Sequence, residues 1–468
     1  MGQETASESE LETASPSETD SKEDRPLQQG NLLWVKQIGG AAEDSPGRVA
    51  VVDGAIVVTG SFSESVVLNE NESDETTLTA LGKTDTFVVR YSEDGRLAWV
   101  KQVGGGGNET TPGDLVTFPD GASLYSGRIR SVSGENQAPV VIRDGAADET
   151  SLNPAEHIEY YNARLKPDGA LAWAQLGELT VQVMAALPDG SAIGVRQSSL
   201  SESVLSIVKY RDDGTADWVR KAYGSPAVSV GAVTALADSS VILVGEFTGD
   251  SVILNLDEPD EIETFGYWDI FIANYGADGA PLWVKTVGGW YYDFGNGVLS
   301  EAGDVIVVGR CPEDCVFAED EPNEITVDVD AFSSDDFIAK YRADGAFVWT
   351  QFGDWIRQPT AILTQAGTVM LTGASVTADR LGDAPILASA GRDVFLAELD
   401  SDGTLAWAKP GDEAYTIVGV DIVYLNEENA VVVIGRFKGA VTFGAGEPNE
   451  TVLSSHGFFD VFVAKYMI

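Results

Sequence analysis

Basic residues, histidine, cysteine and long apolar runs are all scarce in this chain of 468 residues. Its 29 Lys and Arg stand against 74 Asp and Glu, a formal net charge of −45, which repels phosphate backbones and anionic lipid and attracts cations. We therefore expect no nucleic-acid partner. The longest apolar runs, such as Ala430 to Ile434, fall far short of the ~20 residues that span a bilayer, so we expect no transmembrane segment.

Catalytic signatures are also missing. Two histidines, His157 and His456, leave little scope for histidine-based acid–base or metal chemistry. The chain has no Gly-x-Ser-x-Gly elbow, no His-Glu-x-x-His pair and no phosphate-binding glycine loop that opens a helix. A converging pair of acids, as in glycoside hydrolysis, stays open. We expect a non-enzymatic protein, with a carboxylate-based enzyme acting on polysaccharide as the alternative.

The only two cysteines, Cys311 and Cys315, enclose Pro312, Glu313 and Asp314. This spacing can close a small loop as a disulfide in an oxidising compartment, whereas a metal site would need further ligands. The pair therefore indicates a local disulfide or two free thiols.

Residues 1–29 carry eight acids and many Ser and Thr, with Leu11 and Leu27 as the only large apolar residues. Such a segment cannot offset the entropy of ordering, so it predicts a disordered acidic tether. A Met-Gly-Gln start followed by a tether fits a secreted protein, or one lipid-anchored at the cell surface through a Cys, whose signal peptide is missing from this sequence. A chain with no signal fits as well.

A hairpin recurs along the chain. Residues 85–103 read DTFVVRYSEDGRLAWVKQV: an alternating strand, an Asp94-Gly95 turn and a second alternating strand that contains Trp99. Asp-Gly suits a tight turn because both residues tolerate positive φ, and flanking alternation is a strong hairpin signal. Five more copies pair such a turn with a tryptophan: Asp168-Gly169 with Trp173, Asp213-Gly214 with Trp218, Asp278-Gly279 with Trp283, Asp344-Gly345 with Trp349, and Asp402-Gly403 with Trp407.

Two unpaired halves of this hairpin stand at the ends of the repeat array. Residues 31–40 match the Trp-bearing second strand, and residues 460–468 match the first strand. Their pairing would complete a seventh hairpin and close the array into a ring, whereas an open solenoid ends in atypical capping repeats. We therefore expect the first strand of the domain to pair with the last.

A second strand pair separates successive hairpins, as in residues 48–62 with a turn at Asp53-Gly54. Seven such pairs alternate with seven hairpins, which gives four strands in each unit. Four-stranded antiparallel sheets arranged radially form a β-propeller, a solution with few exposed edges. The sequence predicts an all-β, seven-bladed propeller over residues 30–468. The expected blades are approximately 41–104, 105–178, 179–225, 226–289, 290–354, 355–412, and 413–468 plus 30–40.

The repeat resembles a known bacterial family. The phrases FIAKYRADGAFVWTQFG, DVFVAKY and LLWVKQIGG are similar to the bacterial seven-bladed β-propeller repeat known as the SBBP repeat. The resemblance covers roughly residues 30–468 and implies a propeller of an exported or surface protein, without a particular activity. Blades 2 and 3 depart from the Asp-x-Phe opening, with EYYNARL at 159–165 and LSIVKY at 205–210.

Acidic segments of variable length lie between the second and third strands of most blades. These connections leave the blade on the same side as the loops after the Trp strands, so we expect one acidic rim that carries the functional loops. Inserts such as SVVLNENESDETTLTA (65–80) predict protruding hairpins. Calcium takes six to eight oxygens, but no insert matches an EF-hand. We interpret the acidic tips as solvated, with no cofactor, and keep calcium as the alternative, bound by Asp74, Glu75, Asp257, Asp260 and Asp320.

Aromatic residues gather in the loops that follow the Trp strands of the later blades. Rings beside carboxylates suit stacking on sugars, whose hydroxyls the acids can bind; the other interpretation is that the rings pack between blades. The candidate ligand-binding residues are Trp290, Tyr291, Tyr292, Asp293, Trp355, Asp412 and Tyr415.

Residues that recur in nearly every blade are interpreted as structural. They are the Asp of each Asp-Gly turn, the Asp of the Asp-x-Phe motif (Asp85, Asp269, Asp393, Asp460) and the seven blade tryptophans. The leading functional hypothesis is a binding scaffold that presents its acidic, aromatic loop face to a protein or glycan. A structural surface protein that assembles with copies of itself is the third hypothesis.

Overall fold

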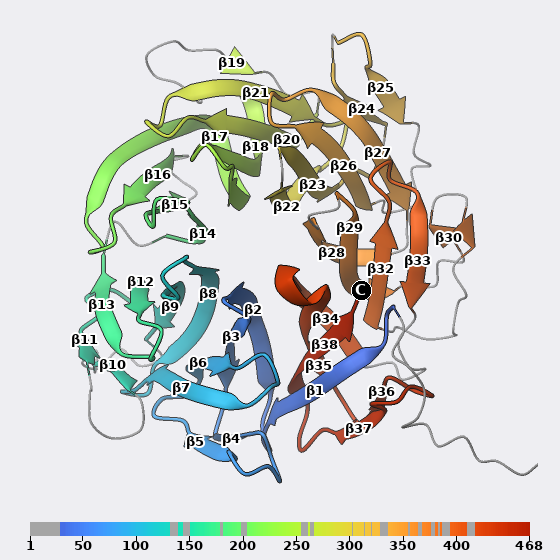
Figure 1. The fold of residues 1–468 in the computed structure, drawn as a ribbon. Coiled ribbons are helices and arrows are strands. Elements are labelled where there is room, and N and C mark those ends of the chain that lie inside the picture. Colours follow the sequence, from blue (N-terminus) through green and yellow to red (C-terminus); the bar gives the residue numbers. More distant parts are fainter. Residues whose placement is uncertain are drawn as a thin grey trace, which may run out of the picture.

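A computed structural model shows an all-β chain whose sheets are arranged radially as a seven-bladed propeller (Figure 1). The structure describes residues 29–131, 139–143, 150–177, 181–197, 204–253, 261–262, 266–301, 303–312, 314–319, 321–327, 336–353, 356–363, 367–375, 380–381, 384–385, 394–409 and 417–468. Each blade is a four-stranded antiparallel sheet, as predicted.

The four strands of a blade run in chain order from the central axis outward. The innermost strands are β2 (Asp44–Val52), β8 (Glu109–Thr117), β14 (Val183–Ala186), the second half of β17 (Ala216–Ala235), β22 (Phe294–Glu301), β28 (Ile356–Leu363) and β34 (Ile417–Leu425). The second strands are β3 (Ala55–Phe62), β9 (Ser123–Arg130), β15 (Ala192–Gln197), β18 (Val241–Ile253), β23 (Asp304–Arg310), β29 (Val369–Ser375) and β35 (Ala430–Phe437).

The third and fourth strands of each blade lie progressively farther from the central axis. The third strands are β6 (Asp85–Tyr91), β12 (Ile158–Leu165), β16 (Val204–Tyr210), β20 (Asp269–Tyr275), β26 (Asp336–Arg342), β32 (Val394–Leu399) and β38 (Asp460–Met467). The outer strands are β7 (Leu97–Gly104), β13 (Leu171–Leu176), the first half of β17, β21 (Pro281–Val287), β27 (Phe347–Gly353), β33 (Leu405–Lys409) and β1 (Leu32–Gly39). A 3-10 turn, η2 (Asn426–Glu428), joins β34 to β35.

The second and third strands form the core because neighbouring blades cover both of their faces. Every residue of β20 is buried, including Ile270, Phe271 and Ile272 at 0% exposure. Such strands read as nearly continuous apolar runs, whereas an outer strand such as β7 is partly exposed from Leu97 to Val100 and carries Lys101 and Gln102 in its buried half. The burial pattern therefore explains why the second and third strands are the most apolar parts of the repeat.

The ring closes as predicted. In blade 7, β1 pairs antiparallel with β38, with Val35 opposite Ala464, and β38 pairs with β35. The order is β34-β35-β38-β1, so the first strand of the domain is the outer strand of the last blade. The N–H of Gly30 also donates to the Met467 carbonyl at 2.8 Å, which extends the pairing to the end of the chain.

The two rims of the propeller are different. At the crossover rim, each outer strand ends and the chain crosses to the next blade. At the turn rim lie the Asp-Gly turns. There the aspartate Oδ1 accepts the backbone N–H two residues ahead at about 3 Å, as for Asp168 with Ala170 and Asp344 with Ala346. These contacts confirm the structural interpretation of the turn aspartates.

The inserts form short hairpins, as expected, but two of them pair with the outer strand of the preceding blade and do not protrude freely. β4 (Ser65–Leu68) and β5 (Thr76–Thr79) form a hairpin in which β4 pairs with the end of β1, the outer strand of the preceding blade. β10 (Val140–Arg143) and β11 (Thr150–Leu152) add to β7 in the same way. The other insert strands are β19 (Glu261–Ile262), β24 (Cys315–Phe317), β25 (Ile325–Val327), β30 (Arg380–Leu381), β31 (Ala384–Pro385), β36 (Ala440–Phe443) and β37 (Thr451–Ser454).

The acidic tip of the first insert lies close to the turn rim. The sequence had predicted the acidic tips on the crossover rim, together with the loops after the Trp strands. The β4–β5 hairpin starts at the crossover rim, but its tip reaches the start of β7, where Asp74 Oδ2 accepts the Leu97 N–H at 2.7 Å. The Glu72 carboxylate binds Lys36 Nζ at 2.7 Å on the preceding blade. The tip therefore bridges two blades along the outer wall, close to the turn rim.

Within the described part of the chain, no helix has the length and hydropathy needed to cross a bilayer.

Candidate functional site

Four exposed aromatic rings form a patch on the crossover rim of blade 4. Their side chains are exposed by 75% for Trp290, 59% for Tyr267, 50% for Tyr291 and 44% for Tyr292. The rings of Tyr267 and Tyr292 stack with centroids 5.5 Å apart and planes within 6°, and Tyr291 stands at 75° to Tyr292. We call these four residues the blade 4 aromatic patch.

The patch is built by two loop segments that hydrogen-bond to each other. The loop after β21, residues 288–293, reads GGWYYD, and the segment before β20 contains Tyr267 and Trp268. The Trp268 N–H donates to the Tyr291 carbonyl at 3.2 Å, and the Asp293 N–H donates to the Trp268 carbonyl at 2.9 Å. A Cβ at Gly266 would lie 2.6 Å from the carbonyl carbon of Trp290, so only glycine permits this approach. The backbone is therefore fixed while the rings point outward.

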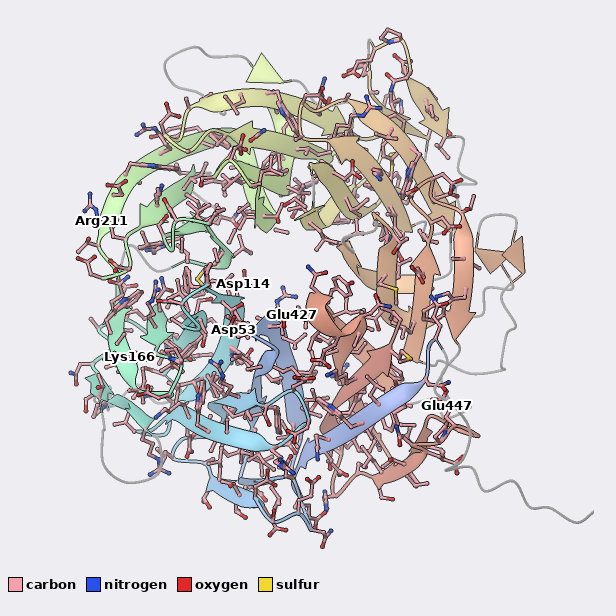
Figure 2. All side chains as sticks on the ribbon, viewed as in Figure 1. Asp53, Asp114, Lys166, Arg211, Glu427 and Glu447 are labelled. Carbon is pink, nitrogen blue, oxygen red and sulfur yellow. A yellow bond between two sulfur atoms is a disulfide. The ribbon has the colours of Figure 1, made fainter. Side chains whose placement is uncertain are left out.

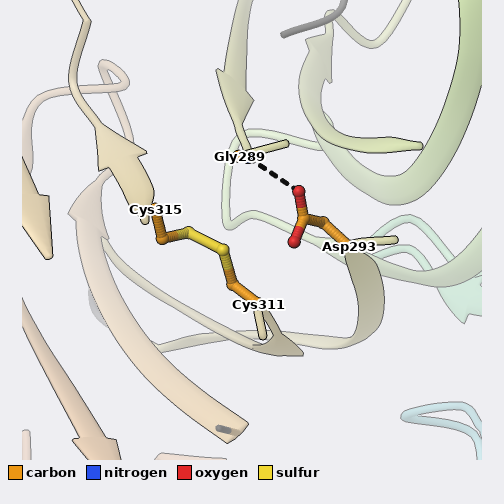
Figure 3. Close-up of a disulfide and its surroundings, with 4 residues drawn as sticks. All are labelled: Gly289, Asp293, Cys311 and Cys315. Carbon is orange, nitrogen blue, oxygen red and sulfur yellow. Dashed lines mark hydrogen bonds between the residues drawn. A yellow bond between two sulfur atoms is a disulfide. The ribbon is translucent and has the colours of Figure 1, made fainter. Parts of the chain in front are cut away.

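Asp293 does not belong to the exposed surface, which corrects its assignment as a ligand-binding residue. Its side chain is fully buried, and Oδ2 accepts the Gly289 N–H at 2.7 Å (Figure 3). A carboxylate beneath the loop cannot reach a ligand on the rings above it. Asp293 instead holds the loop in the shape that presents Trp290 and its neighbours.

The disulfide lies close to this loop. Cys311 and Cys315 are joined and fully buried, with Cα atoms 6.1 Å apart (Figure 3). Directly after the bridge, the Val316 N–H donates to the Gly288 carbonyl at 3.0 Å. The bridged insert of blade 5 therefore supports the base of the blade 4 loop.

Three sequence-based candidates for this face, Trp355, Asp412 and Tyr415, lie outside the described residues. Sequence reasoning missed Tyr267. A signal was present, since Tyr267 stands two residues before the Asp-x-Phe aspartate Asp269 and therefore lies on the same rim.

The candidate calcium ligands Asp74 and Glu75 form hydrogen bonds within their own insert. Asp74 Oδ2 accepts from Leu97 N–H and Asn69 Nδ2, and Glu75 Oε2 accepts the Asn71 N–H at 2.8 Å. The Oδ1 atoms of Asp74 and Asn69 are buried without a hydrogen-bond partner, so two oxygens remain for a cation. Among the described residues no group of three His, Cys, Asp or Glu side chains could hold a metal ion. Asp257, Asp260 and Asp320 lie outside those residues.

Two other inserts repeat the geometry of this tip. Glu-Pro-Asn-Glu occurs at 321–324 and 447–450, where the first tip contains Glu72-Ser73-Asp74-Glu75. Asn323 Nδ2 donates to the Phe347 carbonyl at 2.8 Å, and Asn449 Nδ2 donates to the Leu32 carbonyl at 3.1 Å. An asparagine thus takes the place of Asp74 at the start of the outer strand, so this position fastens the tip to the blade.

Three charged residues from three blades meet at the wall of the central opening. Arg48 Nε lies 3.8 Å from Asp114 Oδ1, and Asp421 Oδ2 accepts the Val49 N–H at 2.9 Å. Figure 2 shows Asp114 beside the opening. A cavity of about 170 Å³ is lined by all three side chains. Sequence analysis did not single them out, because no local motif links residues so far apart.

We call Arg48, Asp114 and Asp421 the wall cluster. Within it, opposite charges stabilise one another's ionised forms. The charge of Asp421 raises the pKa of Arg48, the charge of Asp114 adds to this shift, and partial desolvation opposes it. Burial raises the pKa of Asp114, while Arg48 and the Met184 N–H act in the other direction. Each carboxylate also binds a backbone amide of the next blade, at Met184 and Val49. The cluster therefore ties blades 7, 1, 2 and 3 together around the axis.

A second buried group of acids lies where the ring closes. Asp44 and Asp460 are both fully buried, and the Oδ1 atom of each has no hydrogen-bond partner. His456 Nδ1 lies 2.9 Å from Asp460 Oδ2, and His456 Nε2 lies 2.8 Å from Glu70 Oε2. Burial raises the pKa of Asp44 to about 8, opposed by the Gly40 N–H and reinforced by the charge of Asp460. Asp44 is therefore mostly protonated at neutral pH.

No family model matches this chain, and no curated protein matches it in sequence. Among solved structures, a protein of unknown function from Dyadobacter fermentans matches with 13% identity over 94% of this chain and 100% of its own, at a TM-score of 0.44. A Pseudomonas brassicacearum lignostilbene dioxygenase matches with 9% identity over 94% and 93%, at 0.41. A Synechocystis apocarotenoid oxygenase mutant matches with 9% identity over 96% and 98%, at 0.40. All three TM-scores lie below 0.5, so the fold assignment depends on the strand pairing.

Proposed function

We propose that this protein is a non-enzymatic binding scaffold and that the blade 4 aromatic patch is its contact surface for a ligand or protein partner. One observation carries the proposal: Trp290, with 75% of its side chain exposed, lies beside three exposed tyrosines on a loop that hydrogen bonds hold in place. Contiguous exposed apolar surface of this kind marks interaction sites, and binding residues concentrate on loops of rigid scaffolds.

The exposure of these rings argues against the packing interpretation for Trp290, Tyr291 and Tyr292. A ring that packs in the interior is buried, as is Phe317, which contacts Phe337 with centroids 5.2 Å apart and is 0% exposed. The patch rings leave between 44% and 75% of their surface in contact with solvent. Their amphipathic character suits a surface that binds and releases a partner.

Membership of the SBBP repeat family is part of the proposal. The repeated Asp-x-Phe strand, Asp-Gly turn and Trp strand support it, together with the propeller fold. We further propose that the protein is exported to the bacterial cell surface or medium, where the Cys311–Cys315 bridge would be maintained. Counting free thiols in protein taken directly from the producing cells tests this; two reactive thiols in the denatured native protein would contradict it.

The two alternative functions receive less support from the described residues. A carboxylate-based enzyme needs an acid that reaches the substrate, and the candidate Asp293 is buried beneath its loop. Assembly into a surface layer would require the patch to bind copies of the same chain. A molecular mass in solution that rises with concentration would favour assembly over a separate partner.

The test of the proposed function is binding to defined glycan and peptide panels. We expect the combined Trp290→Ala, Tyr291→Ala and Tyr292→Ala variant to lose the binding that the wild type shows. Phe458→Ala is the control, because Phe458 is another exposed aromatic residue on the same rim, 52% exposed. If the triple variant binds every member of both panels as the wild type does, the patch is not the contact surface.

A further inference from the structure

Blade 7 contains a counterpart of the segment that carries Tyr267, one residue of the blade 4 aromatic patch. Phe458 and Phe459 precede Asp460, as Tyr267 and Trp268 precede Asp269. The backbone contacts agree, since the Asp44 N–H donates to the Phe459 carbonyl at 3.0 Å and the Asp293 N–H donates to the Trp268 carbonyl at 2.9 Å. The two sites therefore occupy equivalent places on the crossover rim.

In blade 7 two of the protein's own cations lie against the faces of these rings. The Lys438 ammonium lies 3.9 Å from the centre of the Phe458 ring and 6.0 Å from that of Phe459. The Arg436 guanidinium lies 4.8 Å from the centre of the Phe459 ring. Cations within about 6 Å of an aromatic face are attracted by its quadrupole, so both positive charges are held by the rings.

The equivalent positions of blade 4 carry no cation. In blade 7, Arg436 lies opposite Val461 and Phe437 lies opposite Asp460. In blade 4, Glu246 lies opposite Ile270 and Phe247 lies opposite Asp269. This register aligns Glu246 with Arg436, and the next residue, Thr248, with Lys438. Blade 4 thus has aromatic rings, Tyr267 and Trp268, at the positions of Phe458 and Phe459, and it replaces both cations with an acid and a neutral residue.

From this comparison, and building on the proposed function, we infer that the blade 4 aromatic patch binds the lysine or arginine side chains of a basic protein segment. The blade 7 site shows the geometry inside the same molecule, with a cation on the ring face. Blade 4 presents Tyr267, Trp290, Tyr291 and Tyr292 for a cation supplied by a partner.

The charge of the chain favours the same class of partner. A formal net charge of −45 attracts basic segments over long distances and accelerates their encounter. Long-range attraction does not select a place on the surface, because acids are spread over the whole molecule. The blade 4 aromatic patch provides that selection, since its exposed ring faces attract a cation to one place on the surface.

A short peptide of alternating lysine and serine is the probe, with the fully acetylated peptide as its uncharged form. Binding is measured at physiological ionic strength for the wild type and for the combined Trp290→Ala, Tyr291→Ala and Tyr292→Ala variant. The two proteins have the same net charge, so the difference between them excludes unspecific attraction. We expect the wild type to bind the lysine peptide about 10-fold more tightly, equivalent to ~1.4 kcal/mol.

Reciprocal substitutions test the comparison of the two blades. Thr248→Lys places a lysine in blade 4 at the position of Lys438. Because this lysine should occupy the ring that the peptide's cation would contact, we expect about 10-fold weaker peptide binding. Thr77→Lys, at an exposed position on the β4–β5 hairpin, is the charge-matched control. Lys438→Thr removes the cation that lies against Phe458, and we expect the stoichiometry of bound peptide to rise from one to two. Unchanged melting temperatures verify that each variant is folded.

The outcomes separate this inference from the proposed function. Equal binding of the lysine peptide by the wild type and the triple variant overturns the inference. If glycan binding nevertheless depends on the three rings, the proposed function stands with a sugar as ligand. If neither peptide nor glycan binding depends on the rings, both fail. Full peptide binding by a folded Thr248→Lys variant also overturns the inference.

Discussion

The indole N–H of Trp34 donates a hydrogen bond to the carbonyl of Glu93 at 3.0 Å, across the boundary between blades 7 and 1. The contact repeats around the ring: each of these tryptophans donates to the residue just before the next Asp-Gly turn. The other pairs are Trp99 with Pro167, Trp173 with Asp212, Trp218 with Ala277, Trp283 with Ala343, and Trp349 with Ser401.

The seventh tryptophan has a different partner. Trp407 faces the ring closure, where no Asp-Gly turn joins β38 to β1, because these strands belong to opposite ends of the chain. Its indole N–H donates to Glu398 Oε2 at 2.5 Å, and Gln29 Nε2 donates to the same oxygen at 2.9 Å. A side chain thus replaces the missing backbone carbonyl.

Trp99→Phe should destabilise the protein by about 1 kcal/mol, since phenylalanine retains a ring against Gly169 but removes one indole hydrogen bond. Unfolding by urea, followed by fluorescence, measures the change. Trp290→Phe is the matched control, because Trp290 is 75% exposed and should be close to neutral. Equal effects of the two substitutions would show that the inter-blade bond adds nothing.

Removal of residues 460–468 should lower stability far more than removal of residues 1–28. The first deletion takes β38 from between β35 and β1 and opens the ring. Gly39→Ala probes the same joint, because a Cβ at Gly39 would lie 1.9 Å from Asp460 Oδ2. Overpacking of this kind destabilises by about 1–3 kcal/mol. Equal melting temperatures for the two deletions would refute closure.

The ring closure should weaken as the pH rises. Asp44 has a pKa of about 8 in the folded state against 3.8 when exposed, so between these values the folded state holds a proton that the unfolded state has lost. The free energy of unfolding therefore falls with rising pH, by at most ~1.4 kcal/mol per pH unit.

His456 contributes in the same direction. Burial lowers its pKa, but the hydrogen bond and charge of Asp460, with Glu70, outweigh that effect and raise it. Its stabilisation is present below the ordinary value of 6.5 and is lost as the pH rises through the raised value. Denaturant unfolding at several pH values should show a shallower decline between pH 4 and 8 for Asp44→Asn than for the wild type. An identical slope would contradict the role of Asp44.

Calcium should not change the stability of the insert tips. Asp74 and Asn69 leave only two buried oxygens without partners, whereas calcium takes six to eight. Asp74→Ala should therefore lower the free energy of unfolding by about 1–3 kcal/mol equally with and without calcium, through loss of the Leu97 contact. Glu43→Ala is the control, at an exposed acid outside the tips. A calcium-dependent rise in melting temperature that Asp74→Ala abolishes would restore the metal site.

The hairpins and the ring closure were predictable because their signals are local. The Asp94-Gly95 turn, the alternation around Trp99 and the complementary halves at Asn31 and Asp460 each specify structure within a few residues. Closure followed from counting strands, and the pairing of β1 with β38 confirms it. The turn residues and the alternation of side chains along each strand were therefore enough to predict the architecture, without knowledge of long-range contacts.

The candidate site was only partly predictable. Trp290, Tyr291 and Tyr292 were identified from the aromatic loop, but whether rings pack or face solvent depends on neighbouring backbones, such as Gly266 beneath Trp290. The same loop buries Asp293. Neither the alternation pattern nor the charge of this residue could indicate its burial.

The amino-acid sequence by itself determined the strands, their turns and the closed ring of seven blades, since these follow from short-range patterns. The tertiary structure alone decided where the inserts lie, which aromatic rings stay exposed and which charges meet at the axis. Tyr267 and Tyr292 stack because two separate segments of blade 4 meet at its rim, and Arg48 reaches Asp114 because two neighbouring blades pack together. Their contacts depend on how blades pack, which no local pattern encodes.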